Sequence, residues 1–469
     1  MATHNNKIGF RWRNQSTFIV IGAGATLSLN DFLTFPVMAG DNGGAAFLLM
    51  YAFFLLLLGL PLMMSELMLG RMTRQNIVSS LENLSQQYDA SLAWKIAGAM
   101  ALLSGFLILS SYSVLSGWSL AYFVKTGVGV YSGVTLDGVS ALFNKFQSNT
   151  EAMMLWHTLF VILLVAISAQ KLKKGLQRML VFMVPGMAIL LVVGLIYAFY
   201  SNGMQQSIEY ILYPDWSRVD SATPIMALQR AFFTLALGLG IMVIFGAYAD
   251  EKINIGYASV QIIIIDFLFS IMTGLAINAL VFSAGVEPVV DDALAFRVLP
   301  VIFGAHEYGE LFGALFYLML LLAALTTALA ILEVLVSYLS VRFRCSRLRA
   351  AAQTGVAIWL LGLGTIFSYS LWHESGFTMT LYYGEEAHRV INDARFNDVV
   401  IYLSSHIMQP LGALLVAIFV GWKIPRSDSH AALALPNRKL FELWNFSIRY
   451  VTPILVFIVL LSTLGFINS

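Results

Sequence analysis

The distribution of apolar residues predicts a chain that crosses a membrane many times. Apolar runs long enough to span a bilayer, about 20 residues each, recur along the whole sequence and are separated by short polar stretches. None of these stretches is long enough for an ordinary soluble domain, so we expect one transmembrane, all-α domain over residues 1–469. Eleven spans are predicted, near residues 16–39, 43–69, 96–123, 153–169, 179–200, 225–246, 255–284, 310–341, 351–372, 398–422 and 447–467.

Two of these spans are interrupted by residues that a membrane helix usually avoids. The first carries glycines, hydroxyl groups, an amide and the carboxylate Asp31 between Ile21 and Pro36. The sixth carries the sequence Thr234-Leu-Ala-Leu-Gly-Leu-Gly240. Irregular backbone at membrane depth is tolerated only where it is buried in protein or lines a cavity. Such a pair of interrupted spans is typical of secondary transporters, which bind ions and substrate there.

The interrupted spans are the first members of two sets of five spans, at about 16–200 and about 225–422. Because each set has an odd number of spans, the second set starts from the opposite side of the membrane. We therefore expect a 5+5 inverted-repeat fold with the binding site between the halves. The last span, at about 447–467, falls outside the repeat.

Composition and charge support a membrane protein. Only 11% of the residues are charged, against about 25% in soluble domains, and the net charge of +1 gives no sign of a nucleic-acid partner. A single cysteine excludes an internal disulfide and a cysteine-based metal cluster. Of the 27 Lys and Arg residues, 19 fall on the side of the N-terminus. The positive-inside rule then places the N-terminus in the cytoplasm and the C-terminus outside the cell (inner) membrane.

Ionisable groups inside predicted spans are functional candidates by default. They are Asp31, Glu66, Arg230, Asp266 and Glu333. Asp31 and Asp266, with nearby threonine hydroxyls, are suited to bind a small cation, but with Arg230 they also form a cluster that neutralises itself. The sequence leaves both interpretations open. We expect Glu66 and Glu333 to be hydrogen-bonded structural groups or to line the pore.

Hydroxyl and aromatic side chains near the breaks have two interpretations as well. The adjacent Thr326 and Thr327 lie in an apolar helix, where threonines usually donate to a carbonyl of the preceding turn. Beside unwound carbonyls of the first span they would instead complete a sodium site. Tyr112 and Phe233 either pack against neighbours or form a wall and lid beside the substrate.

Several motifs, in this order, resemble the neurotransmitter:sodium symporter family. The resemblance extends from Trp12 to about Phe466, and an eleven-span chain is similar to many bacterial members. The motifs are Phe35-Pro-Val-Met-Ala-Gly-Asp-Asn-Gly-Gly-Ala-Ala-Phe47, Gly59-Leu-Pro-Leu-Met-Met-Ser-Glu-Leu-Met-Leu-Gly70, Tyr112 with Trp118, Phe232-Phe-Thr-Leu-Ala-Leu-Gly-Leu-Gly240, Leu325-Thr-Thr327 with Glu333, and Gln409-Pro-Leu-Gly412.

The resemblance implies solute uptake driven by one or two sodium ions. The second sodium site would use Gly24, Leu27, Ala323, Thr326 and Thr327. The first would use Thr26, Asp31, Thr234 and Asp266. Asp31 replaces the family's usual Asn. In chloride-dependent relatives the halide site would map to Tyr51, Arg230, Thr234, Asp266 and Ser270. Because Arg230 replaces the usual Gln and Asp266 adds negative charge, we expect no chloride requirement.

The resemblance also implies a substrate pocket and two gates. The pocket would be lined by Ala25, Thr26, Ser28, Leu29, Asn30, Ile108, Tyr112, Phe233, Ala236, Leu239, Thr327 and Ile331. The charged pair of the family's outer gate maps to Thr34 and Ile401, so Tyr112 and Phe233 would have to form that gate. At the inner gate Trp12 and Tyr248 match, but the acidic partner near Val341 is missing.

The sequence therefore predicts a transporter and not an enzyme. We expect a sodium-coupled symporter of a small, largely apolar solute, an amino acid or a related zwitterion, that works by alternating access in a lipid bilayer. Two alternatives stay open: a proton-coupled or proton-modulated carrier of the same fold, and a solute sensor that no longer transports. The sequence does not determine the oligomeric state.

Overall fold

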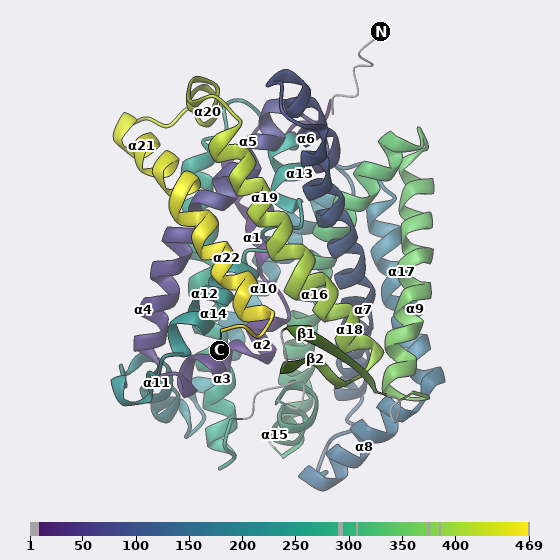
Figure 1. The fold of residues 1–469 in the computed structure, drawn as a ribbon. Helices are drawn as coiled ribbons and strands as arrows, with labels where there is room; N and C mark the ends of the chain where they lie inside the picture. The colour runs from purple at the N-terminus through teal and green to yellow at the C-terminus, as the bar shows by residue number, and fades with distance from the viewer. Residues whose placement is uncertain (1–8, 289–293, 306–307, 373–375, 384–385, 468–469) are drawn as a thin grey trace.

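The protein is a bundle of helices that run between two faces (Figure 1). The computed structural model describes residues 9–288, 294–305, 308–372, 376–383 and 386–467. The face beside Trp12 carries α6 (Ile77–Gln87) and α20 (Arg426–Leu433), and we call it the N-terminal face. The opposite face carries three further short helices, α8 (Leu136–Ser148), α11 (Met204–Leu212) and α15 (Leu299–Ala305).

Nine apolar helices of the described residues are long enough to cross a membrane. They coincide with nine of the predicted spans, and the two remaining predicted spans are broken helices. The nine are α4 (Ala45–Phe54) with η1 (Leu55–Gly59) and α5 (Leu60–Thr73); η2 (Leu92–Trp94) with α7 (Lys95–Gly127); α9 (Thr150–Ser168); α10 (Leu176–Phe199); α14 (Ile255–Ser283); α16 (Gly309–Arg342); α17 (Arg347–Tyr369); α18 (Phe396–Ile401) with η5 (Tyr402–Met408) and α19 (Gln409–Trp422); and α21 (Arg438–Phe446) with η6 (Ser447–Val451) and α22 (Thr452–Thr463).

The first span is broken where the sequence predicts it. It consists of α1 (Gln15–Thr26), α2 (Asn30–Leu33) and α3 (Phe35–Asp41). The backbone N–H of Ser28 does not continue the helix, because it donates to the Asp31 carboxylate at 2.8 Å. The carbonyl of Gly24, which would accept that N–H in a continuous helix, is therefore released from its helical bond.

The sixth span is broken as well. Its halves are α12 (Thr223–Thr234) and α13 (Ile241–Tyr248), with irregular backbone between them. Ala236, Gly238 and Gly240 have φ angles of +50°, +80° and +75°. Glycine adopts this left-handed region readily, so the two glycines allow the chain to turn here.

The broken helices lie inside the bundle and pack against several spans, of which α16 is the most buried. α1 packs on α10, α14 and α16, and α13 packs on α5. In the most apolar stretch of α16, 78% of the residues are buried. The close approach of α5 and α13 depends on small residues at the contact, because a Cβ on Gly246 would lie 2.0 Å from the Leu67 carbonyl oxygen.

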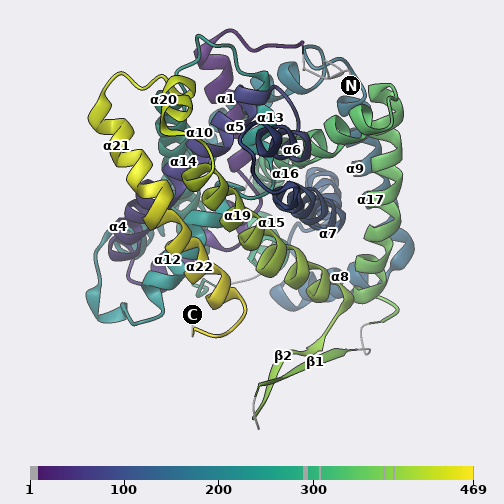
Figure 2. The same cartoon turned by 45° about the horizontal axis from the view of Figure 1, so that its top comes forward.

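Short elements outside the spans are the main difference from the sequence prediction. The polar stretches include the short helices named above, η3 (Trp216–Arg218) and η4 (Leu294–Val298). An antiparallel hairpin, β1 (Phe377–Tyr383) and β2 (Glu386–Ala394), projects beyond the bundle (Figure 2). The last membrane helix begins at Arg438 and not near residue 447, because the amphipathic helix α21 continues directly into its apolar part.

Candidate functional site

A cavity of about 320 Å³ lies where the two broken spans face α7, α16 and α19. Its wall contains 11 of the 12 residues expected to line the substrate pocket. The exception is Leu29, whose side chain is fully buried. The backbone N–H of Leu29 still points toward the pocket wall, since it lies 3.4 Å from the Tyr112 hydroxyl oxygen.

The cavity also has polar lining residues that the sequence reasoning missed. The polar ones include Gln229, His406 and Gln409, and the apolar Met226 also lines the wall. Met226 and Gln229 are spaced seven and four residues before Phe233, which places all three on one face of α12. The helical spacing from Phe233 could therefore have predicted Met226 and Gln229 as lining residues. No sequence pattern predicts that His406, from η5, lines the same wall.

The residues expected to form the second sodium site meet at the break in the first span. The Thr327 hydroxyl donates to the Leu27 carbonyl at 2.9 Å, which joins α16 to the unwound backbone. The Thr326 hydroxyl donates to the Ala323 carbonyl of its own helix at 3.0 Å. A Cβ on Gly24 would lie 3.7 Å from the Thr326 Cβ, so Gly24 of α1 lies close to Thr326 of α16. Neutral hydroxyl and carbonyl oxygens are the ligand types that hard cations prefer.

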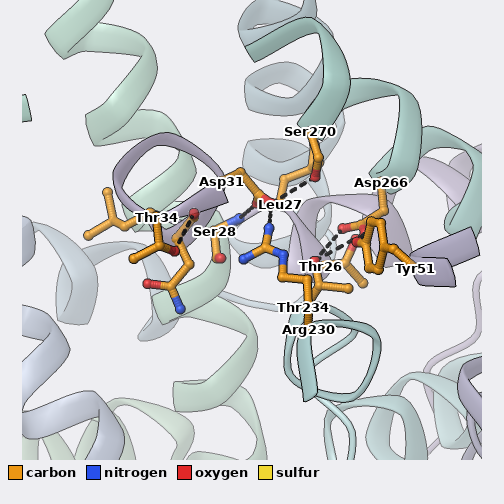
Figure 3. Close-up of polar contacts among 12 residues, drawn as sticks. Thr26, Leu27, Ser28, Asp31, Thr34, Tyr51, Arg230, Thr234, Asp266 and Ser270 are labelled. Carbon is orange, nitrogen blue, oxygen red and sulfur yellow. Dashed lines mark hydrogen bonds and ion pairs between the residues drawn. The ribbon is translucent and has the colours of Figure 1, made fainter. Parts of the chain in front are cut away.

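The residues expected to form the first sodium site meet in two connected groups (Figure 3). Asp31 forms an ion pair with Arg230 and accepts a hydrogen bond from the Ser270 hydroxyl at 2.9 Å. Asp266 accepts hydrogen bonds from the Thr234 hydroxyl at 3.1 Å and from the Tyr51 hydroxyl at 3.3 Å. The Asp31–Arg230 pair of the predicted self-neutralising cluster therefore forms, while Asp266 has hydroxyl partners.

Two side chains far away in the sequence hold the break in the sixth span. A carboxylate oxygen of Glu66 accepts the backbone N–H of Gly238 at 2.7 Å. The amide of Gln409 donates to the Leu237 carbonyl at 2.8 Å. These bonds satisfy backbone groups that the irregular turn leaves without helical partners. Glu66 is thus a hydrogen-bonded structural group, one of the two roles expected for it.

Buried side chains close the bundle between the cavity and the N-terminal face. Trp12 is 1% exposed and stacks edge-on against Tyr248, with ring centroids 5.2 Å apart. Its backbone N–H donates to the Tyr248 carbonyl at 2.7 Å. The Tyr248 hydroxyl donates to Glu333, and Arg347 forms an ion pair with the same carboxylate.

Glu333 is the acidic group of these contacts, whereas the family resemblance would place one near Val341. It lies two helical turns earlier on α16 and is fully buried. The sequence reasoning missed Arg347, because it belongs to the next helix and the pairing depends on how α16 and α17 pack. The Asp250 backbone N–H donates to the Trp12 carbonyl, and the backbone N–H of Lys252 and the charge of Arg11 lower the pKa of the Asp250 carboxyl.

The cavity opens away from the N-terminal face. Thr34 and Ile401, which replace the charged outer pair, line both this cavity and a second one of about 420 Å³. The second cavity extends past Trp118 and Asp398 toward the opposite face. The two cavities therefore lead from the broken spans toward the face opposite the N-terminal face.

We expect Arg347→Met to destabilise the closed N-terminal face. The change leaves the buried Glu333 carboxylate without its ion-pair partner, which costs at most about 3–5 kcal/mol. Thermal unfolding of the purified protein should therefore show a lower melting temperature. Arg349→Met is the matched control, because Arg349 is exposed on the same helix. Equal melting temperatures for the two variants would contradict a stabilising role of the pair.

Many membrane helices, two of them interrupted around a cavity within the bundle, define a secondary transporter. The model of the sodium:neurotransmitter symporter family matches residues 10–129 and 139–467. The chain belongs to the sodium:neurotransmitter symporter family.

Relatives and a solved structure agree with this membership. The sodium-dependent transporter YhdH of Bacillus subtilis is 29% identical over 466 residues, which covers 98% of each chain. A sodium-dependent transporter of Haemophilus influenzae is 28% identical over 98% of this chain and 100% of its own. The crystal structure of MhsT in complex with L-phenylalanine has a TM-score of 0.84 and 33% identity, and covers 97% of this chain and 99% of its own.

Family membership settles the coarse function. The protein is a multi-pass membrane transporter and not an enzyme, and its family couples transport to sodium. The predicted fold class, an all-α inverted-repeat transporter with broken first and sixth spans, is confirmed.

Proposed function

We propose that this protein is a sodium-coupled symporter of a small, largely apolar amino acid or related zwitterion. The observation that carries the proposal is the contact between the Thr327 hydroxyl and the Leu27 carbonyl at the break in the first span. An ion held there by Gly24, Leu27, Ala323, Thr326 and Thr327 would tie α1 to α16. Occupancy of the site would then favour one conformation of the first span over another, as coupling requires.

The proposed cycle starts from a conformation like this one, open away from the cytoplasm. The distribution of Lys and Arg supports a cytoplasmic N-terminal face in the cell (inner) membrane. Sodium binds first, and substrate beside Tyr112 and Phe233 permits closure of the outer side. Release of sodium to the cytoplasm then follows opening of the inner contacts between Trp12, Tyr248 and Glu333.

The cavity wall supports a solute with an apolar body. Ile108, Phe233 and Ile331 form much of the apolar wall, and the Tyr112 hydroxyl lies beside the backbone of the break. The Ser28 N–H is already bonded to Asp31, so it is less available to a substrate carboxylate. MhsT, whose crystal structure contains L-phenylalanine, supports testing aromatic amino acids first.

A thermal-shift screen with and without sodium tests the substrate class. A ligand that binds the native state at about 100 times its Kd stabilises it by about 2.7 kcal/mol. We expect amino acids to raise the melting temperature only when sodium is present. A shift that is equal in sodium and in potassium would contradict sodium coupling.

Uptake into proteoliposomes separates the alternatives. The proposal expects accumulation driven by a sodium gradient at constant pH. Asp266, a buried carboxylate with hydroxyl partners, keeps a proton-coupled carrier as the second candidate. Uptake that follows a pH gradient without sodium would support that candidate. Ligand-dependent sodium binding without flux would support a sensor.

A further inference from the structure

Arg230 joins the outer halves of the two broken spans through a fully buried carboxylate. It projects from α12 and forms an ion pair with Asp31 of α2 (Figure 3). The Arg230 side chain is 5% exposed and the Asp31 side chain 0%. The guanidinium also lies over the Phe35 ring, 5.1 Å from its centroid.

Both carboxylate oxygens of Asp31 are occupied by donors. Oδ1 accepts from Arg230 and from the Ser270 hydroxyl, and Oδ2 accepts the Ser28 backbone N–H. These contacts come from three separate segments of the chain. A metal ion at Asp31 would have to displace at least one of these donors and would face the guanidinium charge directly.

Asp266 has a different environment. Its carboxylate is fully buried, and among the described residues it accepts hydrogen bonds from the hydroxyl groups of Thr234 and Tyr51. Among the described residues, no ion pair involves Asp266. With both carboxylates ionised, the three charged side chains of this cluster carry a net charge of −1, and Asp31 is the carboxylate in ion-pair contact with Arg230. A buried charge without a partner is costly in a membrane protein.

We infer that Arg230 is a fixed counter-cation for Asp31, so that Asp266 alone supplies the charge that binds one monovalent cation at the first site. Thr26 and Thr234 provide neutral oxygens beside that carboxylate, and Asp31 is a positioning residue and not a ligand. One bound sodium ion brings the cluster to zero net charge. An additional halide would return it to −1, so the site takes no anion. This inference rests on the proposed sodium coupling and specifies the ion composition of its first site.

The inference makes Arg230 and Asp31 interdependent. In Asp31→Asn, Arg230 loses its partner and becomes the counter-ion of Asp266, which leaves no net charge for sodium. In the double variant Asp31→Asn/Arg230→Gln, the net charge of −1 is restored at Asp266. A single neutral substitution at position 31 should therefore remove a sodium ion, and a second neutral substitution should bring it back.

Sodium binding to the purified full-length protein tests this charge balance. Scintillation proximity with radioactive sodium at saturation gives the number of ions per protein. We expect Asp31→Asn to lose one sodium relative to wild type, and the double variant to regain it. Replacing chloride with gluconate should change neither number.

A second variant keeps the test valid if Asp31→Asn does not fold. Asp266→Asn preserves the Asp31–Arg230 pair and should also lose one sodium, with the chloride result unchanged. Full sodium binding by Asp31→Asn or by Asp266→Asn would overturn the inference, as would a chloride requirement in the wild type. Absence of sodium binding in the wild type would instead refute the proposed function itself.

Discussion

Thr327→Ala is expected to abolish sodium-dependent uptake. The substitution removes the hydroxyl that joins α16 to the Leu27 carbonyl at 2.9 Å. Loss of such a buried polar contact costs about 1–3 kcal/mol, which corresponds to an apparent sodium affinity about 5- to 150-fold weaker. Uptake into proteoliposomes at increasing sodium concentrations measures both effects.

Two matched variants show whether the effect belongs to the sodium site. Thr327→Ser keeps the hydroxyl and should retain most of the uptake. Thr354→Ala removes an equally buried threonine of α17, whose hydroxyl donates to the Ala350 carbonyl of its own helix at 2.8 Å. Uptake and sodium activation like those of the wild type in Thr327→Ala would discard the second-site assignment.

Gly70→Ala is expected to disrupt the contact between α5 and α13. A Cβ at this position would lie 1.8 Å from the Val243 carbonyl oxygen and 2.7 Å from the Ala247 backbone nitrogen. These are backbone atoms of α13, so the helix itself must move. Overpacking of this kind costs about 1–3 kcal/mol and occasionally more. We expect a lower melting temperature and weaker closure of the N-terminal face, because α13 carries Tyr248.

Gly194→Ala in α10 is the control for this prediction. No atom lies within 4 Å of a Cβ added there, and alanine is the better helix former by about 1 kcal/mol. Its melting temperature should equal or exceed that of the wild type. If Gly70→Ala unfolds at the same temperature as Gly194→Ala, the close approach of α5 and α13 does not constrain the fold.

For Glu66 and Glu333, the sequence predicts that each carboxylate needs a partner but not which residue provides it. Their place inside apolar spans indicated that each needs a partner, because a carboxylate in a membrane helix is costly by itself. The sequence did not indicate which partner. Glu66 bonds to the backbone of Gly238, 172 residues away, and Glu333 bonds to Tyr248 and Arg347 from two other elements.

At the ion sites, too, the sequence indicates the candidate groups and the packing of the helices decides their partners. Thr326 and Thr327 are adjacent and chemically alike, yet Thr326 bonds within its helix and Thr327 reaches the first span. Local sequence does not distinguish them, because the direction of each hydroxyl depends on the helix opposite. The pairing of Arg230 with Asp31, and not with Asp266, likewise depends on the tertiary positions of two segments that are 199 residues apart.

The sequence alone determined the membrane helices and the positions of the two breaks, because hydropathy and the residues that interrupt a helix act locally along the chain. It also determined the family, since the motifs occur in order over nearly the whole length. Only the tertiary structure decided which side of the cavity is closed, which carboxylate is paired, and which side chains hold the broken backbone. Those outcomes depend on contacts between residues that are far apart in sequence, and such contacts form only when the helices pack.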